Sequence, residues 1–190
     1  MELSAIISKL DRLDKMIYEN ILVYADPQWL RDISLFLVKD SHIIPPLILF
    51  FLIYGYKNPR AAVLLFFSTL LLLGISEPVS STLKSIFQRP RPINQMGIYI
   101  ASGIYSLPSA HSLNTMAFAV FWSSRFKSAA PYLFSFSIII GTARMLSNFH
   151  FPGDIIAGWF FGFIVGTSFV LVYNHIEKKF PNIFMKQVST

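Results

Sequence analysis

Basic side chains and prolines follow a long apolar stretch near the middle of the chain. The run reads Lys84-Ser-Ile-Phe-Gln-Arg-Pro-Arg91-Pro92. Lysine offers phosphate a point charge and arginine offers a planar fork of donors. The prolines stiffen the segment, so its cations would point in fixed directions. The run indicates a phosphate site, although basic residues also occur at ordinary helix ends.

A second cluster, Pro108-Ser109-Ala110-His111, lies where an apolar helix would begin. The first turn of a helix carries unpaired N–H groups and the positive end of the helix dipole, so it can bind an anion. Ser109 adds a hydroxyl group, and His111 adds a side chain that titrates near neutral pH. Proline and serine are also common helix-start residues, so this cluster alone is a weak signal.

A third cluster has the spacing Arg144-x5-His150-x3-Asp154. Pro152 and Gly153 predict that a helix begins between the histidine and the aspartate, which places His150 on the preceding loop and Asp154 in the first turn. A carboxylate there can hold one imidazole N–H and leave the other ring nitrogen free to attack. The pair could instead only fasten the loop.

Phosphoryl transfer requires what these clusters supply together. It needs cations on the phosphate oxygens, a nucleophile in line with the phosphorus and an acid for the leaving oxygen. The clusters contain three suitable cations, a possible anion-binding helix start and two histidines, one with a carboxylate partner. They predict removal of a phosphate group by a histidine nucleophile.

The composition indicates the surroundings in which such a site would lie. The 190 residues are 54% hydrophobic and only 14% charged, whereas soluble domains are about a quarter charged. The net charge of +6 comes from Lys and Arg beside apolar segments, which favours a membrane topology signal over nucleic-acid binding. The absence of Cys excludes disulfides and thiolate metal sites. The charged N-terminus does not resemble a signal peptide.

The apolar segments predict the fold. We expect a single all-α domain of residues 1–190, an integral-membrane helical bundle of about five to six transmembrane helices. The first segment could start nearer Ile33. The expected segments are 43–56, 61–87, 109–122, 128–146 and 153–176.

Residues 1–24 show helical spacing of apolar residues with charges between them, which predicts an amphipathic helix. It could lie in the membrane interface or pack against the bundle, and the sequence favours neither.

Loop charges predict the orientation in the membrane. One set of loops carries Lys57, Arg60, Arg125, Lys127, Lys178, Lys179 and Lys186, opposed by Glu177 alone. Residues 1–41, with five basic and seven acidic residues, and the loop 88–108 fall on the other side. The positive-inside rule makes the first side cytoplasmic. The chemistry would then face the periplasm or exterior of a bacterial inner membrane.

The three clusters, over residues 84–154, occur in the order and spacing of the type-2 phosphatidic acid phosphatase family, which the chain resembles. That family includes bacterial acid phosphatases and vanadium haloperoxidases. The resemblance implies that His150 attacks phosphorus to form a phosphohistidine, that Asp154 orients it and that His111 protonates the leaving oxygen. It also implies a metal-free, cofactor-free reaction. The phosphate-binding residues that it implies are Lys84, Arg91 and Arg144, with Ser109 and the N–H groups of Ala110 and His111.

Two positions differ from the family pattern, which usually has Gly at position 110 and often Ser at position 143, where this chain has Ala110 and Ala143. We expect activity to survive both changes. Arg89 does not fit the spacing from Lys84, so we interpret it as an outer helper or a lipid-headgroup contact. Glu77, two helical turns before Lys84, is interpreted as a structural ion-pair partner.

The resulting function is a membrane lipid phosphatase acting in the bilayer on the terminal phosphate of a lipid phosphate or diphosphate. Undecaprenyl diphosphate, phosphatidylglycerophosphate and lipid A 1-phosphate all fit, and the sequence does not choose among them or indicate an oligomeric state. Two alternatives stay open: phosphoryl or headgroup transfer between lipids, and a non-catalytic lipid-binding or transport protein.

Overall fold

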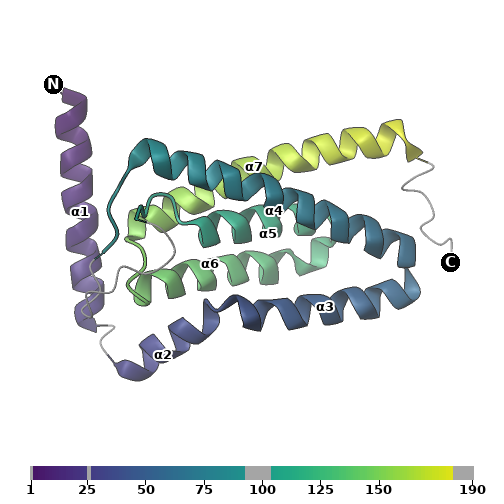
Figure 1. Ribbon diagram of the computed structural model, residues 1–190, viewed down its shortest axis with the longest axis horizontal. Helices are drawn as coiled ribbons and strands as arrows, with labels where there is room; N and C mark the ends of the chain where they lie inside the picture. Colours follow the sequence, from purple (N-terminus) through teal and green to yellow (C-terminus); the bar gives the residue numbers. More distant parts are fainter. Residues whose placement is uncertain (1, 25–26, 93–103, 182–190) are drawn as a thin grey trace.

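The computed structural model describes residues 2–24, 27–92 and 104–181, and these residues are almost entirely helical. The predicted all-α bundle with an N-terminal helix is confirmed (Figure 1). The helices are α1 (Glu2–Tyr24), α2 (Gln28–Leu37), α3 (Asp40–Lys57), α4 (Pro59–Phe87), α5 (Ala110–Arg125), the short 3₁₀ helix η1 (Lys127–Ala129), α6 (Ala130–Leu146) and α7 (Pro152–Lys179).

All five predicted apolar segments form helices, and three of them are long and apolar enough to cross a membrane. These three are Pro59–Phe87, Lys127–Leu146 and Pro152–Lys179. In α3 the apolar part is shorter, Ile44–Lys57. Helix α5 has 16 residues, about 24 Å of helix, and it lies between α4, α6 and α7. A central helix of this kind needs no full-length lipid-facing surface.

Helix α2 is separate from α3, although the sequence suggested only an earlier start for the first span. The chain turns at Val38 (φ −88°, ψ 1°) and Lys39 (φ −82°, ψ 117°). No glycine or proline marks this turn, which explains why the residue pattern did not reveal it. Phe36 and Leu37, at the end of α2, line the same cavity as His42 of α3.

Glycines on one face of α7 allow it to pack closely on α5. Gly158, Gly162 and Gly166 recur every four residues, a spacing that lets membrane helices approach each other. A Cβ atom added to Gly162 would meet the Leu113 backbone and the Cβ of Met116. This contact brings together the starts of α5 and α7, beside which two of the three sequence clusters lie.

We expect Gly162→Ala to destabilise the protein by about 1–3 kcal/mol, because the added methyl group meets backbone that cannot move aside. Thermal melting in detergent measures the effect. Gly74→Ala is the matched control, since a Cβ atom there meets nothing within 4 Å. Equal melting temperatures for the two variants would contradict the close packing of α5 and α7.

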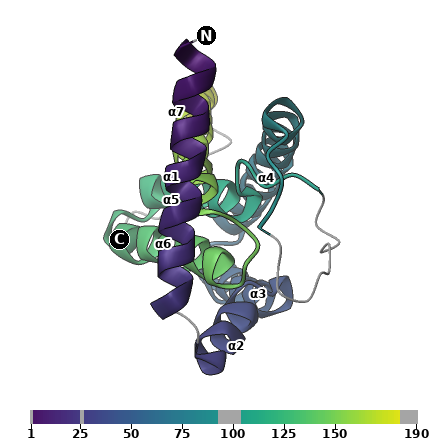
Figure 2. The same ribbon diagram turned by 90° about the vertical axis from the view of Figure 1, so that its left-hand side faces the viewer.

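Helix α1 lies across one end of the bundle, roughly perpendicular to the other helices (Figures 1 and 2). Tyr18 Oη donates to Oδ1 of Asn148 (2.9 Å), and the N–H of Gly153 donates to Oδ1 of Asp14 (2.8 Å). A neighbouring face of α1 keeps its apolar side chains exposed, among them Ile6, Leu10 and Leu13. The helix therefore packs on the bundle and also offers an apolar edge suited to a membrane interface.

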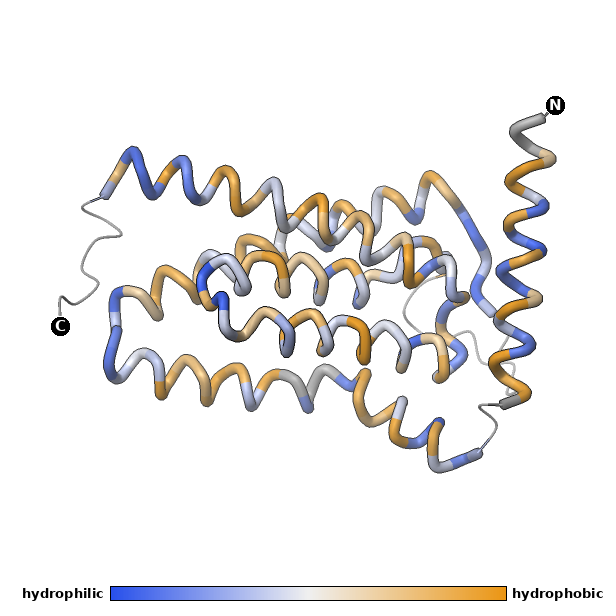
Figure 3. Tube along the Cα trace, turned by 180° about the vertical axis from the view of Figure 1, so that it is seen from behind, coloured by the Kyte–Doolittle hydropathy of each residue, from blue (hydrophilic) through white to orange (hydrophobic). Residues whose placement is uncertain are grey.

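The basic loops gather at the end of the bundle opposite α1. The turn between α3 and α4, the turn between α5 and α6 and the end of α7 all lie there (Figure 3). They carry the described members of the predicted cytoplasmic set: Lys57, Arg60, Arg125, Lys127, Lys178 and Lys179. Lys186 and positions 93–103 of the loop 88–108 lie outside the described residues.

Candidate active site

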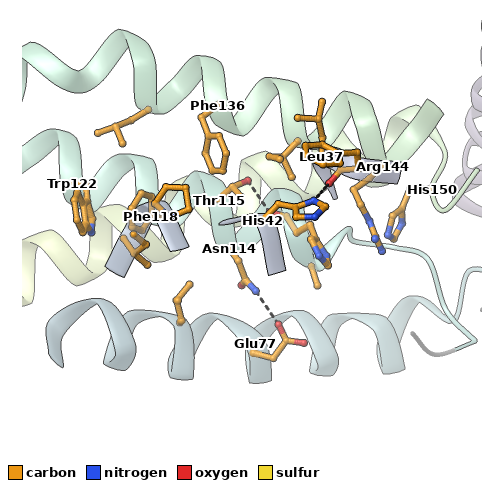
Figure 4. Close-up of a pocket in the computed structure, with 18 of the residues that line it drawn as sticks. Leu37, His42, Glu77, Asn114, Thr115, Phe118, Trp122, Phe136, Arg144 and His150 are labelled. Carbon is orange, nitrogen blue, oxygen red and sulfur yellow. Dashed lines mark hydrogen bonds between the residues drawn. The ribbon is translucent and has the colours of Figure 1, made fainter. Parts of the chain in front are cut away.

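One cavity of about 890 Å³ brings most of the predicted site residues together. It is bounded by helices α2 to α6 and by the loop before α7 (Figure 4). Its polar end is lined by five residues from the three sequence clusters: Lys84, Arg91, His111, Arg144 and His150. The remaining wall is mostly apolar. Side chains that are up to 66 positions apart in the sequence thus face a common space.

The loop between α6 and α7 places His150. Helix α6 ends at Leu146, and Asn148 takes a positive φ of 60° that reverses the chain, a conformation that asparagine tolerates better than most residues. The N–H of Phe149 then donates to the carbonyl of Arg144 (3.1 Å). The guanidinium of Arg144 stacks on the Phe149 ring at 4.1 Å. The same turn therefore fixes both the histidine and one predicted phosphate ligand.

The partners of His150 define its protonation. Arg91 Nη1 lies 3.2 Å from Nε2 of His150 and donates to the Phe149 carbonyl (2.9 Å). An arginine can only donate, so Nε2 must be the unprotonated nitrogen and Nδ1 must carry the proton. Nδ1 faces Oδ2 of Asp154 at 3.5 Å, too long for a normal hydrogen bond but close enough for charge attraction. Nε2 is therefore the nitrogen with a lone pair for attack.

Asp154 is held by the start of its own helix. Pro152 and Asp154 occupy the first and third positions of α7, and Oδ2 of Asp154 accepts the N–H of Phe151 (2.9 Å). An acidic side chain in the first turn caps the helix and suits its dipole. Arg89 Nη1 donates to the other oxygen, Oδ1 (2.8 Å). The carboxylate is fully buried, so these contacts fix it.

Burial sets the charge of His150. The side chain is 1% exposed, and this burial lowers the pKa of His150 to about 4, against the opposing pull of Asp154 and with the help of the Arg91 charge. The imidazole is therefore neutral at neutral pH, as a nucleophile must be.

The start of α5 contributes backbone to the site. Gln88 and Asn148 are the non-glycine residues with positive φ in the described part of the chain, so Ala110 keeps an ordinary helical conformation and can offer its N–H to an anion. The Ser109 side chain is fully buried and accepts the N–H of Ser112 (3.4 Å) as a helix cap. Ser109 is not among the residues that line the cavity, so its part in phosphate binding stays a prediction.

From the polar end the cavity extends along α5 into an apolar region. Figure 4 places Phe118 and Trp122 at the end opposite His150 and Arg144. From His111 to Trp122 the helix rises about 17 Å. The lining side chains of this apolar arm are Leu47, Phe50, Leu73, Phe118, Trp122, Leu133 and Phe136.

Polar side chains lie between the two ends of the cavity, and the sequence interpretation missed most of them. Asn114 and Thr115 line the cavity at helical spacing from His111, a signal that could have found them. Glu77 accepts a hydrogen bond from Asn114 (2.9 Å), and its role as an ion-pair partner stays a prediction. His42, stacked on Phe36, also lines the cavity.

No group of three or more His, Cys, Asp or Glu residues suited to a metal ion occurs within residues 2–24, 27–92 and 104–181. Metal independence stays a prediction that chelation can test.

Comparisons with known proteins identify similar chains. A family model described as PAP2 superfamily matches residues 61–178, more than half of the sequence. A transmembrane PAP2-type phosphatidylglycerolphosphate phosphatase from Bacillus subtilis has a similar structure, with a TM-score of 0.68 and 19% identity over 95% of this chain and 90% of that one. LpxE from Aquifex aeolicus has a TM-score of 0.59 and 20% identity over 80% of this chain and 93% of that one. No match is found among curated proteins.

Proposed function

The chain belongs to the PAP2 superfamily, and from that premise we propose that it is a multi-pass membrane phosphatase that hydrolyses the terminal phosphate of a lipid phosphate or diphosphate. One observation carries the proposal. The cationic, histidine-containing end and the apolar arm belong to the same cavity. A phosphorylated headgroup would lie against Lys84, Arg91 and Arg144, while its hydrocarbon chain would follow α5.

The proposed reaction has two steps. Nε2 of His150 attacks phosphorus, the bond from phosphorus to the leaving oxygen breaks, and His111 donates a proton to that oxygen. Water then attacks the phosphohistidine, His111 takes back a proton, and inorganic phosphate leaves with Nε2 restored. Lys84, Arg91 and Arg144, with the N–H groups at the start of α5, stabilise the charge on the phosphate oxygens throughout.

The sequence and the two structural relatives leave several lipids as candidate substrates. We propose to purify the protein in detergent and measure phosphate release from undecaprenyl diphosphate, phosphatidylglycerophosphate and lipid A 1-phosphate, with and without a chelator. Turnover of one lipid phosphate without added metal supports the proposal. No release from any of them contradicts it, and loss of activity on chelation contradicts the metal-free reaction. Transfer of phosphate to an added lipid alcohol would identify a transferase instead.

The basic end of the bundle supports a direction for the site. Because Lys and Arg collect on the cytoplasmic side of membrane proteins, we propose that the end bearing α1 and His150 faces the periplasm or exterior of a bacterial inner membrane. A cysteine introduced at exposed Ile104 should react with an impermeant thiol reagent in intact cells, and one at exposed Lys127 should not. The reverse labelling would contradict the orientation.

Activity should persist in acid well below the ordinary histidine pKa of about 6.5. His150 loses its lone pair only when protonated, and burial lowers its pKa to about 4. We therefore expect the acidic limb of kcat/KM that His150 controls to fall near pH 4. A pH profile measures it, with a separate titration of the substrate because phosphate monoesters titrate near pH 6. An enzyme limb near 6.5 would contradict a buried, neutral nucleophile.

A further inference from the structure

Arg89 joins three acidic side chains that come from opposite ends of the sequence. Its Nη1 donates to Oδ1 of Asp154 (2.8 Å) and meets Oδ2 of Asp14 at 2.7 Å. Its Nε and Nη2 donate to Oδ1 of Asp11 (3.0 and 2.8 Å). Oδ2 of Asp14 accepts no aligned hydrogen bond, so its contact with Arg89 is an ion pair, whereas the contacts with Asp154 and Asp11 are hydrogen bonds. One guanidinium thus connects α1 to the carboxylate that faces His150.

Helix α1 is fastened to the same loop by further contacts. The N–H of Gly153 donates to Oδ1 of Asp14 (2.8 Å). The ring of Tyr18 packs edge-on against the ring of Phe151, with 5.1 Å between the ring centroids. The guanidinium of Arg89 lies over the same Phe151 ring, 4.3 Å from its centroid. Helix α1 therefore contacts residues on both sides of His150 in sequence.

The orientation of the Asp154 carboxylate depends on two donors, one on each oxygen. The Phe151 N–H holds Oδ2, the oxygen that faces His150, and Arg89 holds Oδ1. Without Arg89, one oxygen would lose its partner and the buried charge would lose its nearest cation, so the carboxylate could rotate away from Nδ1. The imidazole would then lose the group that fixes its tautomer.

We propose that Arg89 is a positioning residue for the phosphatase reaction, held in place by Asp11 and Asp14 of α1, so that the N-terminal helix is a working part of the active site. This inference rests on the proposed function. Arg89 does not line the cavity and would not contact the phosphate. It acts through Asp154, and Asp154 acts through His150.

Kinetics of purified variants test the inference with a lipid phosphate that the wild-type protein hydrolyses. We expect Arg89→Gln to lower kcat about 10- to 100-fold, the usual effect of removing a partner that orients an active-site ligand, with KM changed less than threefold. Asp14→Asn should lower kcat severalfold in the wild-type background. In the Arg89→Gln background its effect should be clearly smaller, because the contact between Asp14 and Arg89 is already lost and only the contact of Asp14 with the Gly153 N–H remains. Glu19→Gln is the matched control, since Glu19 is an exposed acid on the same helix.

Several outcomes would overturn the inference. One is a kcat for Arg89→Gln within twofold of wild type. Another is an equal loss of kcat in Glu19→Gln and Asp14→Asn. The third is a loss of kcat from Asp14→Asn that is as large without Arg89 as with it. If Arg89→Gln did not fold, the double variant Asp11→Asn/Asp14→Asn on α1 would replace it in the test. An unchanged kcat of that double variant would overturn the positioning role of Arg89. Each comparison requires that the wild-type protein hydrolyses the lipid phosphate used. A wild type without turnover contradicts the proposed function itself, which keeps the two failures distinct.

Discussion

Replacing His150 with asparagine is expected to reduce phosphate release by about 10⁴-fold or more, the scale seen when a covalent nucleophile is removed. Asparagine nearly preserves the size of the side chain but offers no ring nitrogen for attack. Lys84, Arg91 and Arg144 are untouched, so the phosphate should still bind. The loss should therefore appear in kcat, with KM changed little. Initial rates in detergent, with inorganic phosphate as the measured product, give both values.

The matched control is His175→Asn, which makes the same replacement at an exposed position near the C-terminal end of α7. It should leave kcat unchanged. Brief mixing of radiolabelled lipid phosphate with the wild-type protein should also trap an acid-labile, base-stable label on His150, and the asparagine variant should trap none. Turnover of His150→Asn within tenfold of wild type would exclude this residue as the nucleophile.

Much of the site could be predicted because its chemistry depends on local sequence. Pro152, Gly153 and Asp154 determine where α7 begins, and that start determines where His150 lies. The spacing from Lys84 to Arg91 fixes which arginine enters the cavity. The sequence also predicts the helices, since lipid-facing segments must be apolar and must satisfy their backbone hydrogen bonds internally.

Other features depend on contacts between distant parts of the chain. Arg89 meets Asp11 across 78 positions, and nothing near either residue in the sequence announces the pairing. The sequence left open whether helix α1 lies in the membrane interface or packs on the bundle. In the structure one face of α1 contacts the bundle, and a neighbouring apolar face is exposed. The turn at Val38 has no proline or glycine, and the contacts that span it, His42 Nδ1 to the Phe36 carbonyl (2.8 Å) and the stacking of the two rings, do not show in the residue pattern. Sequence patterns therefore identified the residues proposed to react, and only the tertiary structure shows the contacts proposed to orient them.

The size of the His111 effect should depend on the leaving group. An alkoxide leaving from a lipid monophosphate is strongly basic and needs a proton in the transition state, an effect typically worth about 10²- to 10⁴-fold. A phosphate leaving from a lipid diphosphate is far less basic and needs that proton much less. We therefore expect His111→Gln to lower kcat/KM for a lipid monophosphate by about 10²- to 10⁴-fold, and for a lipid diphosphate by about tenfold or less.

The same variant can be measured with both substrate types in one preparation, so that folding and detergent affect both rates equally. His42→Gln serves as the control, because His42 also lines the cavity but lies on α3 and belongs to none of the three sequence clusters. It should change the two rates by the same factor. Equal losses for monophosphate and diphosphate in His111→Gln would mean that His111 holds the phosphate and does not protonate the leaving oxygen. A loss confined to the monophosphate would assign the proton to His111, because only that bond cleavage requires it.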